Sequence, residues 1–145
     1  MANLEYRLFD EAGDYPALYS YQNIDKGEIA ARFLCDKFIK NGIVYEKTSC
    51  AIEDSLYVIY VKDISKDEPL PLEASSGKTR VELRQDGSSP VPGLLIEAFE
   101  FMDAMEVVIQ LASDYFYCMD REWLKTMIVI DEDRKVYVCY AKPCM

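Results

Sequence analysis

The stretch YVIYVK, Tyr57 to Lys62, occurs a second time near the C-terminus as YVCYAK, Tyr137 to Lys142. Four of the six positions are identical, and the two copies are 137 − 57 = 80 residues apart. Both are rich in the β-branched and aromatic residues that suit strands, and each is predicted to be the second strand of a hairpin that follows a helix. The sequence therefore predicts two copies of one unit, residues 1–62 and 79–142, joined by a connector over residues 63–78.

The helix of the first copy is predicted to begin at Asp25, whose carboxylate can accept hydrogen bonds from the first free N–H groups. Glu28 follows three residues later, as in a capping box. An apolar stripe at helical spacing then runs as far as Phe38. Asn41-Gly42 is interpreted as the end of this helix, because glycine tolerates the left-handed conformation.

The helix of the second copy is predicted to begin at Asp103 and Glu106, at an offset of 106 − 28 = 78 residues from the first. It is expected to extend past Asp120 as far as Trp123 and Leu124. The apolar run before it, residues 94–102, fits a strand or a buried helix, and it is predicted to be a strand because the repeat requires one there.

The fold class predicted from these patterns is α+β, with a single domain over residues 1–145. Each pseudo-repeat is expected to contribute a strand, a helix and a β-hairpin. The strands should form an antiparallel sheet with the two helices on one face.

Composition narrows the possible functions. The formal net charge is −10, which argues against binding to nucleic acids or to anionic membrane surfaces. The chain contains no histidine, which removes serine–histidine and cysteine–histidine catalysis and the commonest metal ligand. No cofactor is expected, and no metal site.

The N-terminus has no basic start followed by an apolar run, so no signal peptide is predicted. The five cysteines form no CxxC motif and are expected to be reduced, in a cytoplasmic protein. Cys35 and Cys118 are expected to be buried late in equivalent helices. Asp131-Glu132-Asp133 could bind a hard cation, but a solvated turn is the favoured interpretation.

The repeated strands are apolar on both faces, because Tyr57, Ile59 and Val61 alternate with Val58 and Tyr60. Two helices can cover one face of the sheet. The other face is expected to remain uncovered and rich in Tyr and Val, and such a patch usually has a partner.

The order strand–helix–hairpin, repeated twice, resembles the tandem ligand-binding domains of the DNA-gyrase-inhibitor-like group, which includes multidrug effector-binding domains. The resemblance lies in the order of elements over most of the chain. It implies a curved sheet with helices behind it and a cavity between the two copies. Aromatic rings and a buried carboxylate would bind organic cations there.

The candidate ligand-binding residues are aromatic and acidic side chains of the expected sheet. For the tyrosines the competing interpretation is core packing, and for the two glutamates it is a solvated strand edge. The candidates are Tyr19, Tyr21, Tyr57, Tyr60, Glu97, Glu100, Tyr137 and Tyr140.

The function predicted from the sequence is non-enzymatic binding of a small hydrophobic ligand, neutral or cationic, on the uncovered face. A protein–protein interaction module, homodimeric or with another partner, would use the same face. An enzyme with carboxylate and tyrosine acid–base chemistry is a third possibility. An acidic mimic that occupies a nucleic-acid-binding protein is a fourth.

Overall fold

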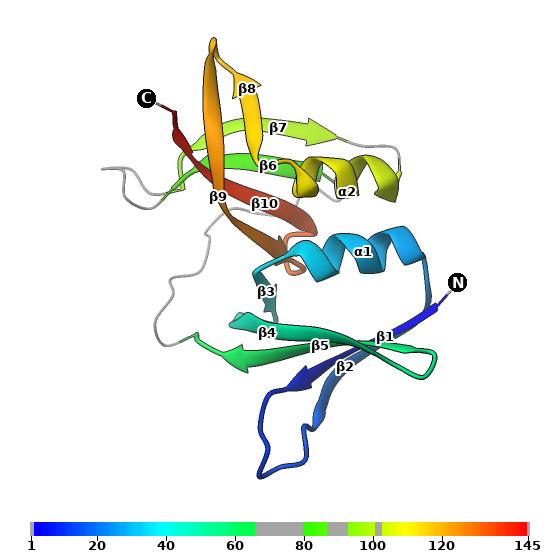
Figure 1. Ribbon diagram of the computed structural model, residues 1–145. Coiled ribbons are helices and arrows are strands. Elements are labelled where there is room, and N and C mark those ends of the chain that lie inside the picture. The colour runs from blue at the N-terminus through cyan, green and yellow to red at the C-terminus, as the bar shows by residue number, and fades with distance from the viewer. Residues whose placement is uncertain (1, 66–79, 87–92, 101–102, 145) are drawn as a thin grey trace.

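The computed structural model describes residues 2–65, 80–86, 93–100 and 103–144 (Figure 1). The connector predicted over residues 63–78 lies mostly outside the described residues, as does most of the turn that follows Gln85. The described elements, in chain order, are β1 (Ala2–Leu8), β2 (Ala17–Ile24), α1 (Lys26–Leu34), β3 (Lys37–Lys40), β4 (Ile43–Glu53), β5 (Leu56–Asp63), β6 (Arg80–Gln85), β7 (Leu95–Glu100), α2 (Ala104–Ala112), β8 (Tyr115–Cys118), β9 (Arg121–Asp131) and β10 (Val136–Pro143).

The strands form one ten-stranded sheet in the order β2-β1-β5-β4-β3-β9-β10-β6-β7, with β8 paired to β9. In the N-terminal half, β1 pairs antiparallel with β2 and parallel with β5. In the C-terminal half, β6 pairs antiparallel with β7 and parallel with β10. The α+β class is confirmed, and YVIYVK and YVCYAK lie in β5 and β10, each the second strand of a hairpin.

The sheet is mixed, so the prediction of an antiparallel sheet was wrong. Among the described strands, three pairs are parallel: β1 with β5, β6 with β10 and β3 with β9. The first two arise because the chain leaves one strand, passes through a helix and returns beside that strand in the same direction. Hairpin reasoning detects only antiparallel neighbours, and these pairs join strands that are far apart in sequence.

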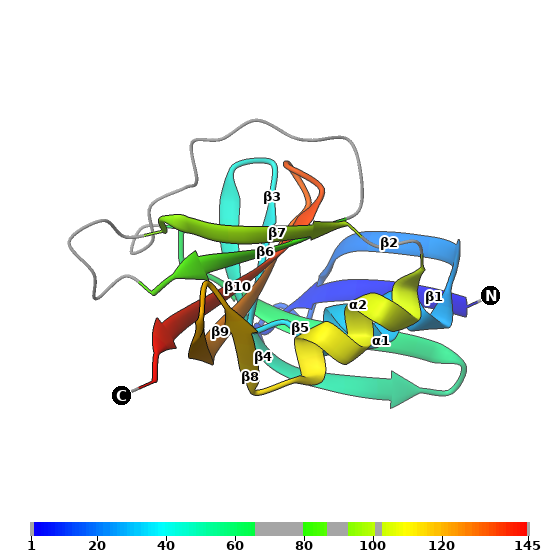
Figure 2. The same ribbon diagram turned by 90° about the horizontal axis from the view of Figure 1, so that it is seen from above.

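Both helices lie side by side on the inner side of the strongly curved sheet, with their N-terminal ends together (Figures 1 and 2). One main core joins them to strands of both halves, and it includes Ile29, Val107, Tyr6, Leu83 and Cys139. Neither described helix is long and apolar enough to cross a membrane.

The first helix is shorter than predicted. It ends at Leu34, and Phe38 belongs to the short strand β3. Asn41 and Gly42, with φ of 53° and 75°, form the tight turn between β3 and β4. Asn-Gly is a strong signal for such a hairpin, and its interpretation as a helix end was wrong.

The second helix is shorter than predicted as well, because it ends at Ala112. Trp123 and Leu124 belong to β9, and Cys118 lies in β8 rather than late in a helix. Met119 and Asp120 have φ of 51° and 59°, so a second two-residue turn connects β8 to β9.

The sheet face away from the helices is less open than the sequence suggested. Val58 and Val138 are buried on this face. A second apolar cluster there is formed by Ile39, Val44, Val129, Val136 and Val138, with Tyr140 packed against it. The expectation of an uncovered Tyr/Val face therefore fails for Val136 and Val138, because side chains of β3, β4, β9 and β10 cover one another, and it fails for Val58, which is fully buried.

Candidate functional site

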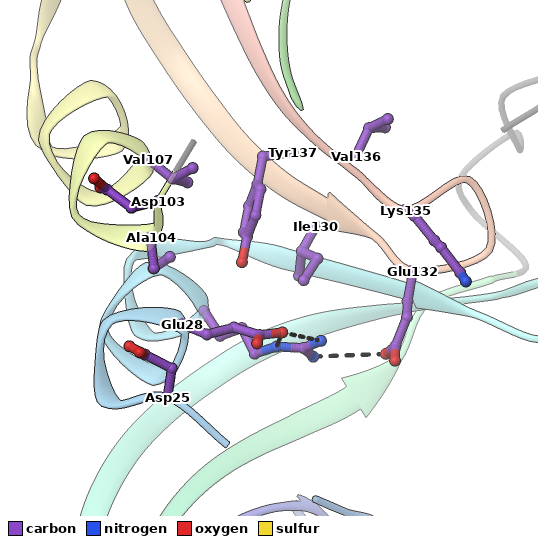
Figure 3. Close-up of a pocket in the computed structure, with 12 residues that line it drawn as sticks. Asp25, Glu28, Asp103, Ala104, Val107, Ile130, Glu132, Lys135, Val136 and Tyr137 are labelled. Atoms are coloured by element: carbon purple, nitrogen blue, oxygen red, sulfur yellow. Dashed lines mark hydrogen bonds and ion pairs between the residues drawn. The ribbon is translucent and has the colours of Figure 1, made fainter. Parts of the chain in front are cut away.

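A pocket of about 590 Å³ lies between the two helices and the hairpin that joins β9 to β10 (Figure 3). Its wall combines apolar side chains with six charged ones. The lining residues are Asp25, Glu28, Ala31, Arg32, Asp103, Ala104, Val107, Ile130, Glu132, Lys135, Val136 and Tyr137.

Two of the pocket carboxylates are helix caps. Asp25 Oδ1 accepts a hydrogen bond of 2.6 Å from the backbone N–H of Gly27, at the start of α1. Asp103 Oδ1 accepts one of 2.9 Å from the N–H of Glu106, at the start of α2. Both carboxylates are on exposed residues, and each balances the partial positive charge of its helix N-terminus.

These two carboxylates retain binding capacity. In the part of the chain that the structure describes, neither Asp25 nor Asp103 forms an ion pair, and no hydrogen bond uses their Oδ2 atoms. Each cap bond occupies one oxygen, so the second oxygen of each carboxylate can accept from a ligand.

Arg32 forms the buried floor of the pocket, where its side chain is 5% exposed. Its guanidinium lies 3.2 Å from Glu28 and 3.5 Å from Glu132, and it donates a 3.2 Å hydrogen bond to the Tyr6 hydroxyl. The ring centroid of Tyr21 is 4.7 Å from the guanidinium carbon, within the range of a cation–π contact.

Glu132 links the hairpin of the second half to the first half. It accepts a hydrogen bond from the Tyr21 hydroxyl and pairs with Lys40 at 3.3 Å as well as with Arg32. Burial and this hydrogen bond raise the pKa of Tyr21, so its hydroxyl remains a donor at neutral pH.

The acidic turn 131–133 is not simply solvated, which corrects the favoured interpretation. Asp131 is buried and accepts a 2.9 Å hydrogen bond from Arg134. Asp133 accepts 2.7 and 2.8 Å bonds from the backbone N–H groups of Asn41 and Gly42. Among the described residues, no group of three or more side chains is placed to hold a metal ion.

Three predicted tyrosines lie at or near the pocket. Tyr137 lines it, and burial raises the pKa of its hydroxyl, which points toward the side where Glu28 lies (Figure 3). Tyr21 is not part of the lining, but its hydroxyl donates a hydrogen bond to Glu132, which is. Tyr19 lies beside Lys40, the cation that pairs with Glu132: the ammonium nitrogen of Lys40 is 5.0 Å from the ring centroid of Tyr19.

The other three tyrosines pack elsewhere. Tyr57 packs edge-on against Phe33 at the main core, with ring centroids 6.1 Å apart. Tyr60 packs edge-on against Tyr15, with ring centroids 5.6 Å apart. Tyr140 packs against the second apolar cluster. The structure does not bring these rings together in one site.

Glu97 and Glu100 lie on exposed positions of β7, at the end of the sheet order. They stand at positions of opposite parity on the strand, as their spacing indicated, with Glu97 opposite Leu83 in the ladder. Burial raises the pKa of the Cys118 thiol, and the nearby Glu97 carboxylate raises it further. The pocket lining includes neither glutamate.

Sequence reasoning identified Asp25 and Asp103 as caps but not as site residues, and it did not single out Arg32. A usable signal for Arg32 was present, because a lone arginine lies inside the apolar run IAARFL of α1. Comparisons with protein families, curated proteins and solved structures found no match for the chain.

Proposed function

We propose that this chain is a non-enzymatic binding protein, and that its pocket takes a small organic cation with an apolar body. The observation that carries the proposal is the chemistry of the lining. Four carboxylates, on Asp25, Glu28, Asp103 and Glu132, and two cations, on Arg32 and Lys135, belong to the lining. The formal charge of the lining is thus −4 + 2 = −2.

The buried cation, Arg32, does not cancel this preference. Arg32 is buried and shared between Glu28 and Glu132, so its charge is already balanced. Asp25 and Asp103 remain as the carboxylates with an oxygen to offer. A cationic ligand group between the two helix N-termini would form charge-assisted hydrogen bonds with both.

The apolar part of the lining suits the body of such a ligand. Ala104, Val107, Ile130 and Val136 supply aliphatic contacts, and Tyr137 supplies a ring whose face attracts cations. The volume is within the range of small-molecule sites. These features support the ligand class of the sequence prediction, at a site other than the sheet face expected there.

We also propose that the two halves of the chain are copies of one structural unit. It is supported by the matching strand pairs of each half and by aspartate caps on both helices. The proposed site then lies where the two copies meet, as the resemblance to the gyrase-inhibitor-like group implies. We place the protein in the cytoplasm, because all five cysteines are unpaired, as thiols are in a reducing compartment.

Calorimetric titration with benzylamine tests the ligand class, with benzyl alcohol and benzoate as neutral and anionic probes of similar size. We expect benzylamine to bind, benzyl alcohol to bind much more weakly, and benzoate not to bind. Equal binding of all three, or preference for benzoate, would reject the proposal.

A further inference from the structure

A second surface of the molecule carries exposed apolar side chains, on α2 and on β8 with its following turn. Their exposed fractions lie between 55% and 75%. We call them the α2–β8 surface: Met105, Ile109, Tyr115, Tyr117 and Met119.

These side chains occupy outward positions of two consecutive elements. On α2 the buried face is formed by Val107 and Leu111, and Met105 and Ile109 lie outside it. On β8 the alternation places Phe116 inside. A surface helix and an edge strand usually carry polar residues at such outward positions.

One edge of strand β8 also has backbone N–H and C=O groups to which a partner could hydrogen-bond. Among the described strands it pairs only with β9, so its other edge carries no ladder. Tyr and Met are residue types enriched at protein interfaces, and methionine adapts its shape to a partner. An apolar surface of this composition is typical of a protein contact rather than of a solvated face.

Most of the charged residues around this surface are acidic. Between Asp103 and Glu122 the chain carries five acidic residues and one basic residue, Arg121. All five acidic residues are exposed: Asp103, Glu106, Asp114, Asp120 and Glu122. Arg121 lies over the Trp123 ring, with 5.6 Å between the guanidinium carbon and the ring centroid.

We propose that the α2–β8 surface docks a cationic protein partner whose apolar side chains contact Met105, Ile109 and Tyr117. Complementary charge on the partner would steer the encounter and fix its orientation. A second copy of this chain fits poorly, because its acidic rim would meet an identical one and the chain carries a net charge of −10. An anionic membrane is disfavoured for the same reason.

The test uses a fluorescent amphipathic peptide of leucine and lysine as the probe and fluorescence anisotropy as the measurement. The same peptide with glutamate in place of lysine is the matched probe of opposite charge. The test variant combines Tyr117→Ser with Met119→Ser. Ile52→Ser is the control, because Ile52 is as exposed, at 66%, but lies at the distant β4–β5 hairpin (Figure 1).

We expect the lysine peptide to bind and the glutamate peptide not to bind, with affinity that falls as salt is added. The double variant should weaken binding by about tenfold or more, while Ile52→Ser leaves it unchanged. Absent binding, or equal binding by the wild type and the double variant, would overturn the proposal. So would a dimer in light scattering that the double variant abolishes, because the surface would then bind a second copy.

Discussion

Gly27 at the start of α1 and Ala104 at the start of α2 lie so close that a methyl group added at position 27 would be 3.0 Å from the Ala104 Cβ. The same methyl group would be 2.9 Å from Oδ1 of Asp25. The absence of a side chain at Gly27 therefore sets the spacing of the two helix N-termini, and with it the distance across which the two cap carboxylates act.

Gly27→Ala should destabilise the protein, although alanine is the better helix former by about 1 kcal/mol. The added methyl group must push apart the two helices and displace the Asp25 cap. We expect the free energy of unfolding to fall by about 1–2 kcal/mol, measured by urea denaturation.

The matched control is Ala104→Gly in the Gly27→Ala background, which removes the opposing methyl group. It should recover part of the loss, beyond what the two single changes predict when added. A Gly27→Ala protein that is more stable than the wild type would show that the helices do not depend on this contact.

Arg32→Met should be among the most destabilising single changes in the described core. The change leaves Glu132 with Lys40 as its remaining cation and removes a donor to the buried Tyr6 hydroxyl. Breaking a buried charge network in this way costs about 3–5 kcal/mol. Arg121→Met, at an exposed arginine, should cost less than about 1 kcal/mol; similar losses in both variants would contradict the assigned role of Arg32.

Glu82 should make stability depend on acid pH. Burial alone would raise the pKa of this carboxyl, but hydrogen bonds from Arg84 at 2.8 Å and Arg134 at 3.1 Å outweigh it and lower the pKa from 4.5 to about 2. The folded state therefore favours the ionised form. This stabilisation is complete above pH 4.5 and is lost as the pH falls toward 2.

Urea denaturation at several pH values between 5 and 2 measures this effect. The contribution of Glu82 is about 3 kcal/mol by proton linkage, and Glu82→Gln should remove that part of the slope while lowering stability at neutral pH. Glu106→Gln, at an exposed position of α2, should leave the slope unchanged. An unaltered slope in Glu82→Gln would show that the two arginines do not hold this carboxylate ionised.

Local sequence patterns predicted much of the fold. The strand character of Tyr57–Lys62 and Tyr137–Lys142 and the caps Asp25 and Asp103 are confirmed. The role of Asn41-Gly42 was predicted wrongly because the same dipeptide is common both at helix C-termini and in hairpin turns. The pairing of β3 with β9 holds residues 37–40 as a strand, and that pairing joins segments about 90 residues apart in sequence.

The site was less predictable than the fold, because it depends on packing between distant elements. Asp25 and Asp103 meet at one pocket only because Gly27 lets α1 approach α2. Glu132 reaches Arg32 across 100 positions of sequence because β9 pairs with β3. Neither contact leaves a periodic signal in the sequence.

The most direct test of the central claim is a benzylamine titration of the variant Asp25→Asn/Asp103→Asn beside the wild type. Asparagine caps helices as well as aspartate does, so the fold and the free energy of unfolding should change little while two pocket charges are lost. We predict that the affinity for benzylamine falls by about tenfold or more, and that weak binding of benzyl alcohol is unchanged. Undiminished benzylamine affinity in the folded variant would contradict the account.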